Sequence, residues 1–308
     1  MTAPTPDPQI AELLRQAAGA PPIETLTPDE ARAASVSAFA AQFGPVDDVE
    51  AAEDVDAGGV PVRVYRPAGI EGPSPAFVYF HGGGWVTGNL ETHDGIARAF
   101  AARTPCVVVS VDYRVAPEHP FPAAVDDAWT ATAWTVAHAA ELGLDPRRIA
   151  VGGDSAGATL AAVVARQSRD RGLGIAAQLL IYPVTDYAFD TESYSLFESG
   201  YGLTREGMRW YWRQYLGGRD DGDDPDLSPL RADDLAGVPP AIVVTAELDV
   251  LRDEGERYAD RLAAAAVATE QVRYDGLVHG FLRMAGVVDR VQEAITEMAA
   301  LLRAALAG

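Results

Sequence analysis

The stretch RIAVGGDSAG, from Arg148 to Gly157, decides how this sequence is expected to fold. Its apolar first half is typical of a short buried strand, and the Ala-rich residues after it predict a helix. Between them lies GDSAG at 153–157, a G-x-S-x-G pattern whose small residues allow the sharp turn that presents a nucleophilic serine. A tight structural turn is the alternative interpretation, because glycine and serine are common in ordinary turns.

Strands and helices alternate along the chain on both sides of this stretch. Apolar or alternating runs predict strands at 60–67, 76–81, 106–113, 148–153, 176–183, 240–247 and 269–275. Helical patterns lie at 92–103, 122–140, 156–170, 252–266 and 286–306. Strands that alternate with helices are typical of α/β proteins, so we expect a mostly parallel central sheet with helices on both faces.

Two regions interrupt this alternation. Residues 1 to about 55 are rich in proline and alanine and carry helical stretches near 8–19 and 28–42, with little sign of a strand. Residues 184–238 contain no buried-strand pattern. An insertion of that size between core strands is more often a lid over a site than an idle loop, and we interpret it as a lid.

The predicted lid has two features of its own. A helical run places large side chains on one helix face, at Met208, Tyr211 or Trp212, and Tyr215. This spacing favours packing inside the lid over direct contact with a ligand. The acidic run DDGDDPD at 220–226 lacks the alternating ligands and closing glutamate of an EF-hand, so we expect a solvated turn there and no calcium site.

The composition excludes several classes of function. The chain has 308 residues with 24 basic and 45 acidic side chains, and every basic residue is arginine. The formal net charge of −21 repels phosphate backbones and anionic lipid headgroups, and there is no local basic patch, so nucleic acid is not an expected partner. Without lysine the chain cannot form a Schiff base or a Walker-type phosphate site. The single cysteine, Cys106, cannot form an intramolecular disulfide or a thiolate metal cage.

The sequence carries no membrane, secretion or cofactor signal. No window approaches about 18 uninterrupted apolar residues, and the N-terminus lacks the charged and apolar regions of a signal peptide. We therefore expect a cytoplasmic protein without stable membrane insertion. Since no metal-ligand spacing and no early G-x-G-x-x-G are present, we expect neither a metal nor a cofactor. The composition is compatible with a monomer and with a homodimer.

A second motif, HGGGW at 81–85, directly follows the apolar run AFVYF. Three consecutive glycines let the backbone approach a substrate closely and turn successive N–H groups toward it, which is the pattern of an oxyanion loop. These groups would act with the N–H of Ala156, which begins the helix after the serine. A phosphate-binding loop is the rival interpretation, but the required G-K-[ST] ending is missing. His81 is then expected to anchor the loop.

An acid and a base follow the serine in the chain order that a triad on this type of fold requires. Asp249 and His279 each lie just beyond a predicted strand, at the carboxyl ends where sites of α/β proteins are built. Glu247 is the alternative acid. Asp253 and Glu254 fall in the first turn of the next predicted helix, where a carboxylate has a structural reason to be present.

Together these motifs resemble those of the hormone-sensitive-lipase family of α/β-hydrolase esterases, also called bacterial family IV esterases. The resemblance extends over most of the chain from about residue 60 onward, with the motifs in the family's order. They are HGGGW (81–85), DYRVAPEHPFPAA (112–124), GDSAG (153–157), LDVLRDEG (248–255) and VHGF (278–281).

The resemblance implies roles for particular residues. Ser155 would be the nucleophile, His279 the base and then the acid, and Asp249 the residue that orients the imidazole. The oxyanion-hole N–H groups would belong to Gly83, Gly84 and Ala156. Two departures from the family's commonest pattern, Ala158 for a glycine and Val250 for a proline, leave every reacting group in place.

The resemblance also implies an architecture and a substrate class. It predicts one α/β-hydrolase domain over 1–308, with a cap made from residues 1 to about 55 and about 184–238. The expected substrates are small carboxylic esters with short- to medium-chain acyl groups. From chain position alone, we expect four residues to line the pocket: Trp85, Tyr182, Tyr201 and Leu203.

Two other functions remain as alternatives. Amide hydrolysis or acyl transfer could use the same triad with a different leaving group or acceptor. A non-catalytic receptor on this fold is disfavoured, because family-related receptors lack the triad histidine and His279 is present here.

Overall fold

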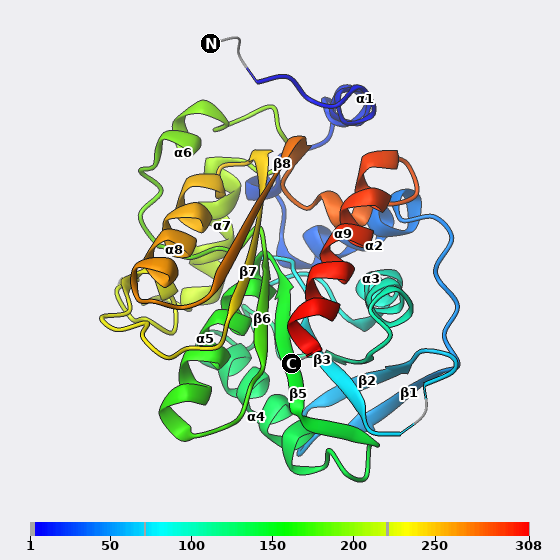
Figure 1. Cartoon of the computed structure of the whole chain (residues 1–308). Helices are drawn as coiled ribbons and strands as arrows, with labels where there is room; N and C mark the ends of the chain where they lie inside the picture. The colour runs from blue at the N-terminus through cyan, green and yellow to red at the C-terminus, as the bar shows by residue number, and fades with distance from the viewer. Residues whose placement is uncertain (1–3, 71, 220–221, 308) are drawn as a thin grey trace.

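The computed structural model describes residues 4–70, 72–219 and 222–307 (Figure 1). In this part of the chain the strands form one eight-stranded sheet in the order β1-β2-β4-β3-β5-β6-β7-β8. The pairs from β4 through β8 are all parallel, whereas β2 runs antiparallel to both β4 and β1. The predicted α/β class with a mostly parallel sheet is confirmed.

The bounds of the elements follow the predicted alternation closely. The strands are β1 (Ala51–Asp56), β2 (Pro61–Arg66), β3 (Ser74–Phe80), β4 (Val107–Val111), β5 (Leu144–Asp154), β6 (Ala177–Ile181), β7 (Ala241–Leu248) and β8 (Thr269–Val278). The helices are α1 (Pro8–Ala17), α2 (Pro28–Gln42), α3 (Leu90–Arg103), α4 (Ala123–Ala137), α5 (Ala156–Arg171), α6 (Glu192–Leu196), α7 (Arg205–Leu216), α8 (Arg252–Ala264) and α9 (Asp289–Leu306). Short 3-10 turns are η1 (Ile23–Thr25), η2 (Pro229–Arg231) and η3 (Phe281–Met284).

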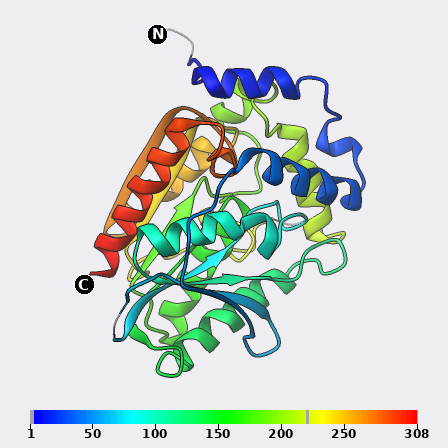
Figure 2. The same ribbon diagram turned by 90° about the vertical axis from the view of Figure 1, so that its right-hand side faces the viewer.

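Helices cover both faces of the sheet (Figures 1 and 2). Helices α3 and α9 pack on one face, while α4, α5 and α8 pack on the other. The central strands β4 and β6 are buried along their whole length, which agrees with their mostly apolar sequences and with helices on both faces. The carboxyl ends of β5, β7 and β8 therefore meet at one edge of a rigid, fully packed sheet.

The N-terminal segment and the long insertion contact each other in space. Helix α7 from the insertion packs against η1 from the N-terminal segment, and α2 packs against α3 and η3. The side chain of Ile23 leaves no room for a Cβ atom at Gly207 in the first turn of α7. Helix α1 contacts β8 and lies at the top of Figure 1, above the sheet.

The irregular regions contain one strand that the sequence did not predict and part of the acidic run. Strand β1 was not expected, because its sequence AAEDVD is polar and mostly exposed, and it pairs only along one side with β2. In the acidic run at 220–226, the first two residues lie outside the described part of the chain. Of the remainder, Asp223 forms an ion pair with Arg231, and Asp226 forms one with Arg166.

Within the described ranges, no helix is long and apolar enough to cross a bilayer.

Candidate active site

Ser155 sits on the sharp turn between β5 and α5 with the backbone angle φ at +54°. Residues other than glycine rarely adopt this backbone conformation, so it marks local strain at Ser155. A Cβ atom at Gly153 or Gly157 would collide with the carbonyl oxygen of Phe80 on the neighbouring strand. The two glycines of the G-x-S-x-G pattern are therefore required by close packing of the turn against β3.

A hydrogen-bonded chain links the three residues of the predicted triad. The distance from His279 Nε2 to Ser155 Oγ is 2.9 Å, and the distance from His279 Nδ1 to Asp249 Oδ2 is 2.7 Å. Asp249 is only 1% exposed, and its second oxygen accepts the backbone N–H of Leu251. A carboxylate has no proton to donate, so Nδ1 carries the hydrogen and Nε2 is left to accept the serine proton.

The alternative acids lie in other contacts. Glu247 accepts the backbone N–H of Gly276, and Asp253 accepts that of Ser193. Glu254 is buried and accepts the N–H of Thr185, at the start of the long insertion. Burial raises the pKa of Glu254 well above its usual value, although its backbone hydrogen bonds oppose the shift. Each of these carboxylates thus has a structural contact of its own, away from His279.

The HGGGW segment forms a tight loop beside the serine. Gly83 and Gly84 have φ angles of +121° and +59°, and the Gly83 carbonyl accepts the N–H groups of Val86 and Thr87. The N–H groups of Gly83 and Gly84 make no hydrogen bond within the described residues, and that of Ala156 is the first of α5. Such N–H groups at a helix start and on a glycine loop can receive a developing negative charge.

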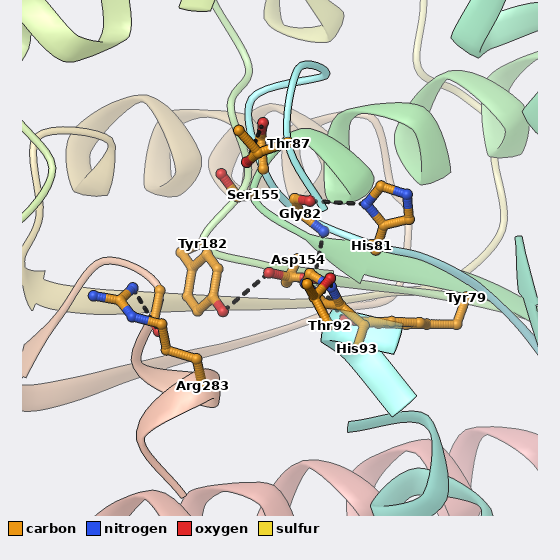
Figure 3. Close-up of polar contacts among 12 residues, drawn as sticks. Tyr79, His81, Gly82, Thr87, Thr92, His93, Asp154, Ser155, Tyr182 and Arg283 are labelled. Carbon is orange, nitrogen blue, oxygen red and sulfur yellow. Dashed lines mark hydrogen bonds and ion pairs between the residues drawn. The ribbon is translucent and has the colours of Figure 1, made fainter. Parts of the chain in front are cut away.

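Asp154, the residue before the serine, ties this loop to the core. Its carboxylate accepts the Gly82 N–H at 2.8 Å, the Tyr79 hydroxyl at 2.5 Å and the Tyr182 hydroxyl at 3.3 Å (Figure 3). Burial acts to raise the pKa of Asp154, but the interaction with His93 and the hydrogen bond from Tyr79 outweigh burial, so the pKa is lowered. A charged carboxylate behind the loop fixes the position of Gly82.

His81 has the anchoring role expected of it. Its Nδ1 lies 2.8 Å from the carbonyl oxygen of Gly82, and its ring stacks on Tyr113. The Tyr113 hydroxyl donates to the His81 carbonyl at 2.6 Å. The imidazole is fully buried, and burial together with neighbouring His93 lowers the pKa of His81 to about 3.

A cavity of about 280 Å³ opens over the serine. Its floor is formed by Ser155, His279 and the glycines of the oxyanion loop. Helix α2 lines it with Ala31, Ala34, Ser35, Ala38 and Phe39. The long insertion lines it with Gly202, Leu203, Met208 and Tyr211. Within the described ranges, no group of three or more histidine, cysteine or acidic side chains is arranged to hold a metal ion.

Of the four residues that were expected to line the pocket, two line the cavity and two do not. Tyr182 and Leu203 line the cavity. Trp85 does not, because its ring is fully buried and stacks on Tyr215 with ring centroids 4.3 Å apart. Tyr201 packs against Phe197 beside the cavity. Chain position alone could not show which way these side chains point.

Sequence reasoning missed three sets of cavity residues. On α2 the small residues Ala31, Ala34, Ser35 and Ala38 follow the spacing of one helix face, and that periodicity could have indicated a close approach. Met208 and Tyr211 were expected to pack inside the lid but line the cavity, and a Cβ atom at Gly84 would collide with the Tyr211 ring. Arg283, four residues after His279, had no sequence signal.

Known proteins are similar to this chain in sequence and in fold. A family model described as alpha/beta hydrolase fold matches residues 77–283. The carboxylic ester hydrolase LipN of Mycobacterium tuberculosis is 46% identical over 258 residues, which cover 81% of this chain and 68% of that protein. The ethyl acetate hydrolase of Pseudomonas putida is 36% identical over 297 residues, 93% of both chains. The crystal structure of a thermostable esterase from Pseudomonas putida ECU1011 superposes with a TM-score of 0.93 at 38% identity, covering 99% of both chains.

The chain therefore belongs to the α/β-hydrolase family, and the resemblance to the hormone-sensitive-lipase esterases is confirmed. The similar proteins named above are all ester hydrolases.

Proposed function

We propose that this protein hydrolyses small carboxylic esters with short- to medium-chain acyl groups through a covalent acyl-enzyme on Ser155. The observation that carries the proposal is the hydrogen-bonded chain from Ser155 through His279 to Asp249, at the floor of a cavity. Ester hydrolysis by LipN and by the other similar proteins supports the choice of reaction.

In the first half-reaction the Ser155 hydroxyl attacks the ester carbonyl while His279 Nε2 takes its proton. The carbonyl oxygen becomes negative in the tetrahedral intermediate, and the N–H groups of Gly83, Gly84 and Ala156 stabilise that charge. The intermediate collapses as the carbon–oxygen bond to the alcohol breaks, and His279 returns the proton to the departing alkoxide. Asp249 orients the imidazole and stabilises its protonated form.

In the second half-reaction a water molecule takes the place of the alcohol. The water oxygen attacks the acyl carbonyl while His279 removes one proton from the water. The same oxyanion hole stabilises the negative charge on the carbonyl oxygen. The bond to Ser155 Oγ then breaks, the serine regains its proton from His279, and the carboxylic acid leaves. One ester and one water thus give one alcohol and one acid, with the enzyme unchanged.

The cavity supports the proposed substrate size. Its volume of about 280 Å³ lies near the lower end of the range of small-molecule pockets. Phe39, Leu203 and Met208 provide apolar walls from the N-terminal segment and from the insertion. These two segments act as the cap of the enzyme, because both contribute walls above the serine.

Initial rates on p-nitrophenyl esters from acetate to palmitate, for wild type and Ser155→Ala, test this proposal. We expect an optimum at short or medium chains and a loss of about 10⁴-fold or more in kcat for Ser155→Ala. The control is Ser37→Ala, which removes an exposed serine hydroxyl of α2 that lies outside the cavity lining.

Three outcomes would contradict the proposal. Retention of most of the activity by Ser155→Ala would exclude the acyl-enzyme on this residue. Hydrolysis of anilides in preference to matched esters would favour an amidase. Tight binding of esters without turnover by folded wild type would favour a receptor.

A further inference from the structure

Arg283 lines the cavity beside the reacting groups, and the mechanism above makes no use of it. It lies on η3, and its Nη1 donates a hydrogen bond to the carbonyl oxygen of Gly280, the residue next to His279. Its Nε donates to Oε1 of Gln42, the last residue of α2. These two contacts hold the guanidinium between helix α2 and the loop that carries His279.

The guanidinium has hydrogen-bonding capacity to spare. It carries five N–H donors, and its Nη2 group makes no hydrogen bond within the described residues. No carboxylate of the described chain lies within ion-pair distance of it, whereas Arg63 and Arg114 each bind an aspartate. Arg283 is therefore a cation at a cavity wall without an anionic partner from the protein.

The surroundings make this unpaired charge costly. Burial lowers the pKa of Arg283, and the nearby Tyr182, Tyr211 and Asp154 oppose the shift. Asp154 is the only carboxylate of these three groups, and it is already bound to Tyr79, Gly82 and Tyr182. In Figure 3 the Tyr182 ring lies between Asp154 and Arg283. A partly desolvated cation gains most from an anion that enters the same cavity.

The other residues that line the cavity indicate the chemical class of this anion. Among the described residues of the wall, Arg283 is the only one with a permanent positive charge, and most of the others are apolar or small. A guanidinium matches a carboxylate geometrically, through two parallel N–H···O bonds. The net charge of −21 repels anions at long range, so an anionic substrate would need such a local contact to bind.

We propose that Arg283 binds a carboxylate of the substrate, so that the preferred esters carry a free carboxylate in addition to the ester group. This inference rests on the proposed ester hydrolysis and specifies its substrate class. The carboxylate can sit on the acyl side, as in half-esters of dicarboxylic acids, or on the alcohol side, as in acylated hydroxy acids.

Two matched substrate pairs test the inference and separate these two sources. Monoethyl succinate is compared with ethyl isocaproate, in which an isopropyl group replaces the carboxylate. The acetyl ester of γ-hydroxybutyrate is compared with isohexyl acetate in the same way. For each pair, the ratio of kcat/KM for the charged ester to kcat/KM for the neutral ester is measured, because the ratio cancels differences in active enzyme concentration.

We expect Arg283→Met to lower this ratio by about 10- to 100-fold in one of the pairs, chiefly through KM, because it removes a charge-assisted hydrogen bond. Arg283→Lys keeps the positive charge and should recover part of the loss. The control Arg290→Met removes one positive charge from α9, away from the cavity, and should leave both ratios unchanged.

A ratio that Arg283→Met leaves unchanged in both pairs overturns the inference. If wild type still hydrolyses the neutral esters through Ser155, the proposed ester hydrolysis stands and only the role of Arg283 is rejected. Hydrolysis of none of the four esters by folded wild type overturns the proposed function, and the inference falls with it. A binding readout adds a second criterion: monoethyl succinate should bind Ser155→Ala more tightly than the double variant with Arg283→Met.

Discussion

His81 illustrates how a single residue under the oxyanion loop couples the site to stability. It is fully buried, and it is neutral in the folded state because burial and His93 lower its pKa to about 3. In the unfolded chain the same side chain takes up a proton near its ordinary pKa of about 6.5. Acid therefore favours the unfolded state between these two values, and the stability that neutral His81 contributes is lost as the pH falls.

This difference predicts a pH-dependent loss of stability that can be assigned to His81. Between about pH 7 and about pH 5, the free energy of unfolding should fall by about 2 kcal/mol more in wild type than in His81→Asn. Asparagine has no group that titrates in this range, and its amide can still donate to Gly82. Urea unfolding at several pH values measures the two slopes.

The exposed His119 provides the matched control for this measurement. His119→Asn makes the same substitution at an exposed position outside the core and should keep the wild-type slope. Equal slopes for wild type and His81→Asn would contradict the argument.

At the scale of residues, the sequence was sufficient to predict the contacts of residues whose order along the chain is set by the chemistry of the triad. The order of Ser155, Asp249 and His279 behind predicted strand ends predicted which side chains meet. Arg283 could not be predicted, because its position in the wall depends on packing between η3 and α2. The expectation for Trp85 was wrong, because its ring is buried against Tyr215, a contact between residues far apart in sequence.

At the scale of elements, α2 forms a wall of the cavity, and its start is defined by a capping box. The Thr27 side chain accepts the N–H of Glu30, and the Glu30 carboxylate accepts the N–H of Thr27. These bonds satisfy backbone groups that have no partner in the first turn of a helix.

We expect Thr27→Ala to lower the free energy of unfolding by about 1 kcal/mol, because the capping hydroxyl is lost. For a chain of 308 residues that corresponds to a decrease in Tm of roughly 1–2 °C. Thr27→Ser keeps a hydroxyl at the same place and should retain nearly all the stability. Thermal unfolding followed by circular dichroism compares the three proteins, and an equal Tm for Thr27→Ala and wild type would exclude a capping role.

The elements differ in how well their sequences reveal them. Strands β3, β4, β6 and β7 are mostly buried and largely apolar, and β5 is apolar and buried in its second half. Strand β8 alternates polar and apolar residues over its first half. All six were predicted. Strand β1 lies at the sheet edge with most side chains in solvent, so it lacks the apolar signal. Helices α2 and α7 were predicted as helices, but which of their faces line the cavity depends on contacts between segments far apart in sequence.

For the whole molecule, the dominant physical quantity is the net charge of −21. Many of the arginines are already paired, and some bind more than one carboxylate: Arg63 contacts Asp54, Glu91 and Asp94. The excess acidic side chains repel one another across the folded surface, and unfolding relieves that repulsion by increasing the distances. Exposed ion pairs offset only a small part of this cost, because each is worth little in water.

Added salt should therefore stabilise the protein. The screening length shrinks from about 30 Å at 0.01 M to about 10 Å at 0.1 M salt, so repulsion across the surface weakens before contacts within ion pairs do. We expect Tm at neutral pH to rise with sodium chloride, with most of the rise below about 0.3 M, and to the same extent with potassium chloride. Differential scanning calorimetry measures the curve. A fall in Tm over this range would mean that the ion pairs outweigh the repulsion, and a rise that begins only above about 1 M would indicate exclusion of salt from the surface instead of screening.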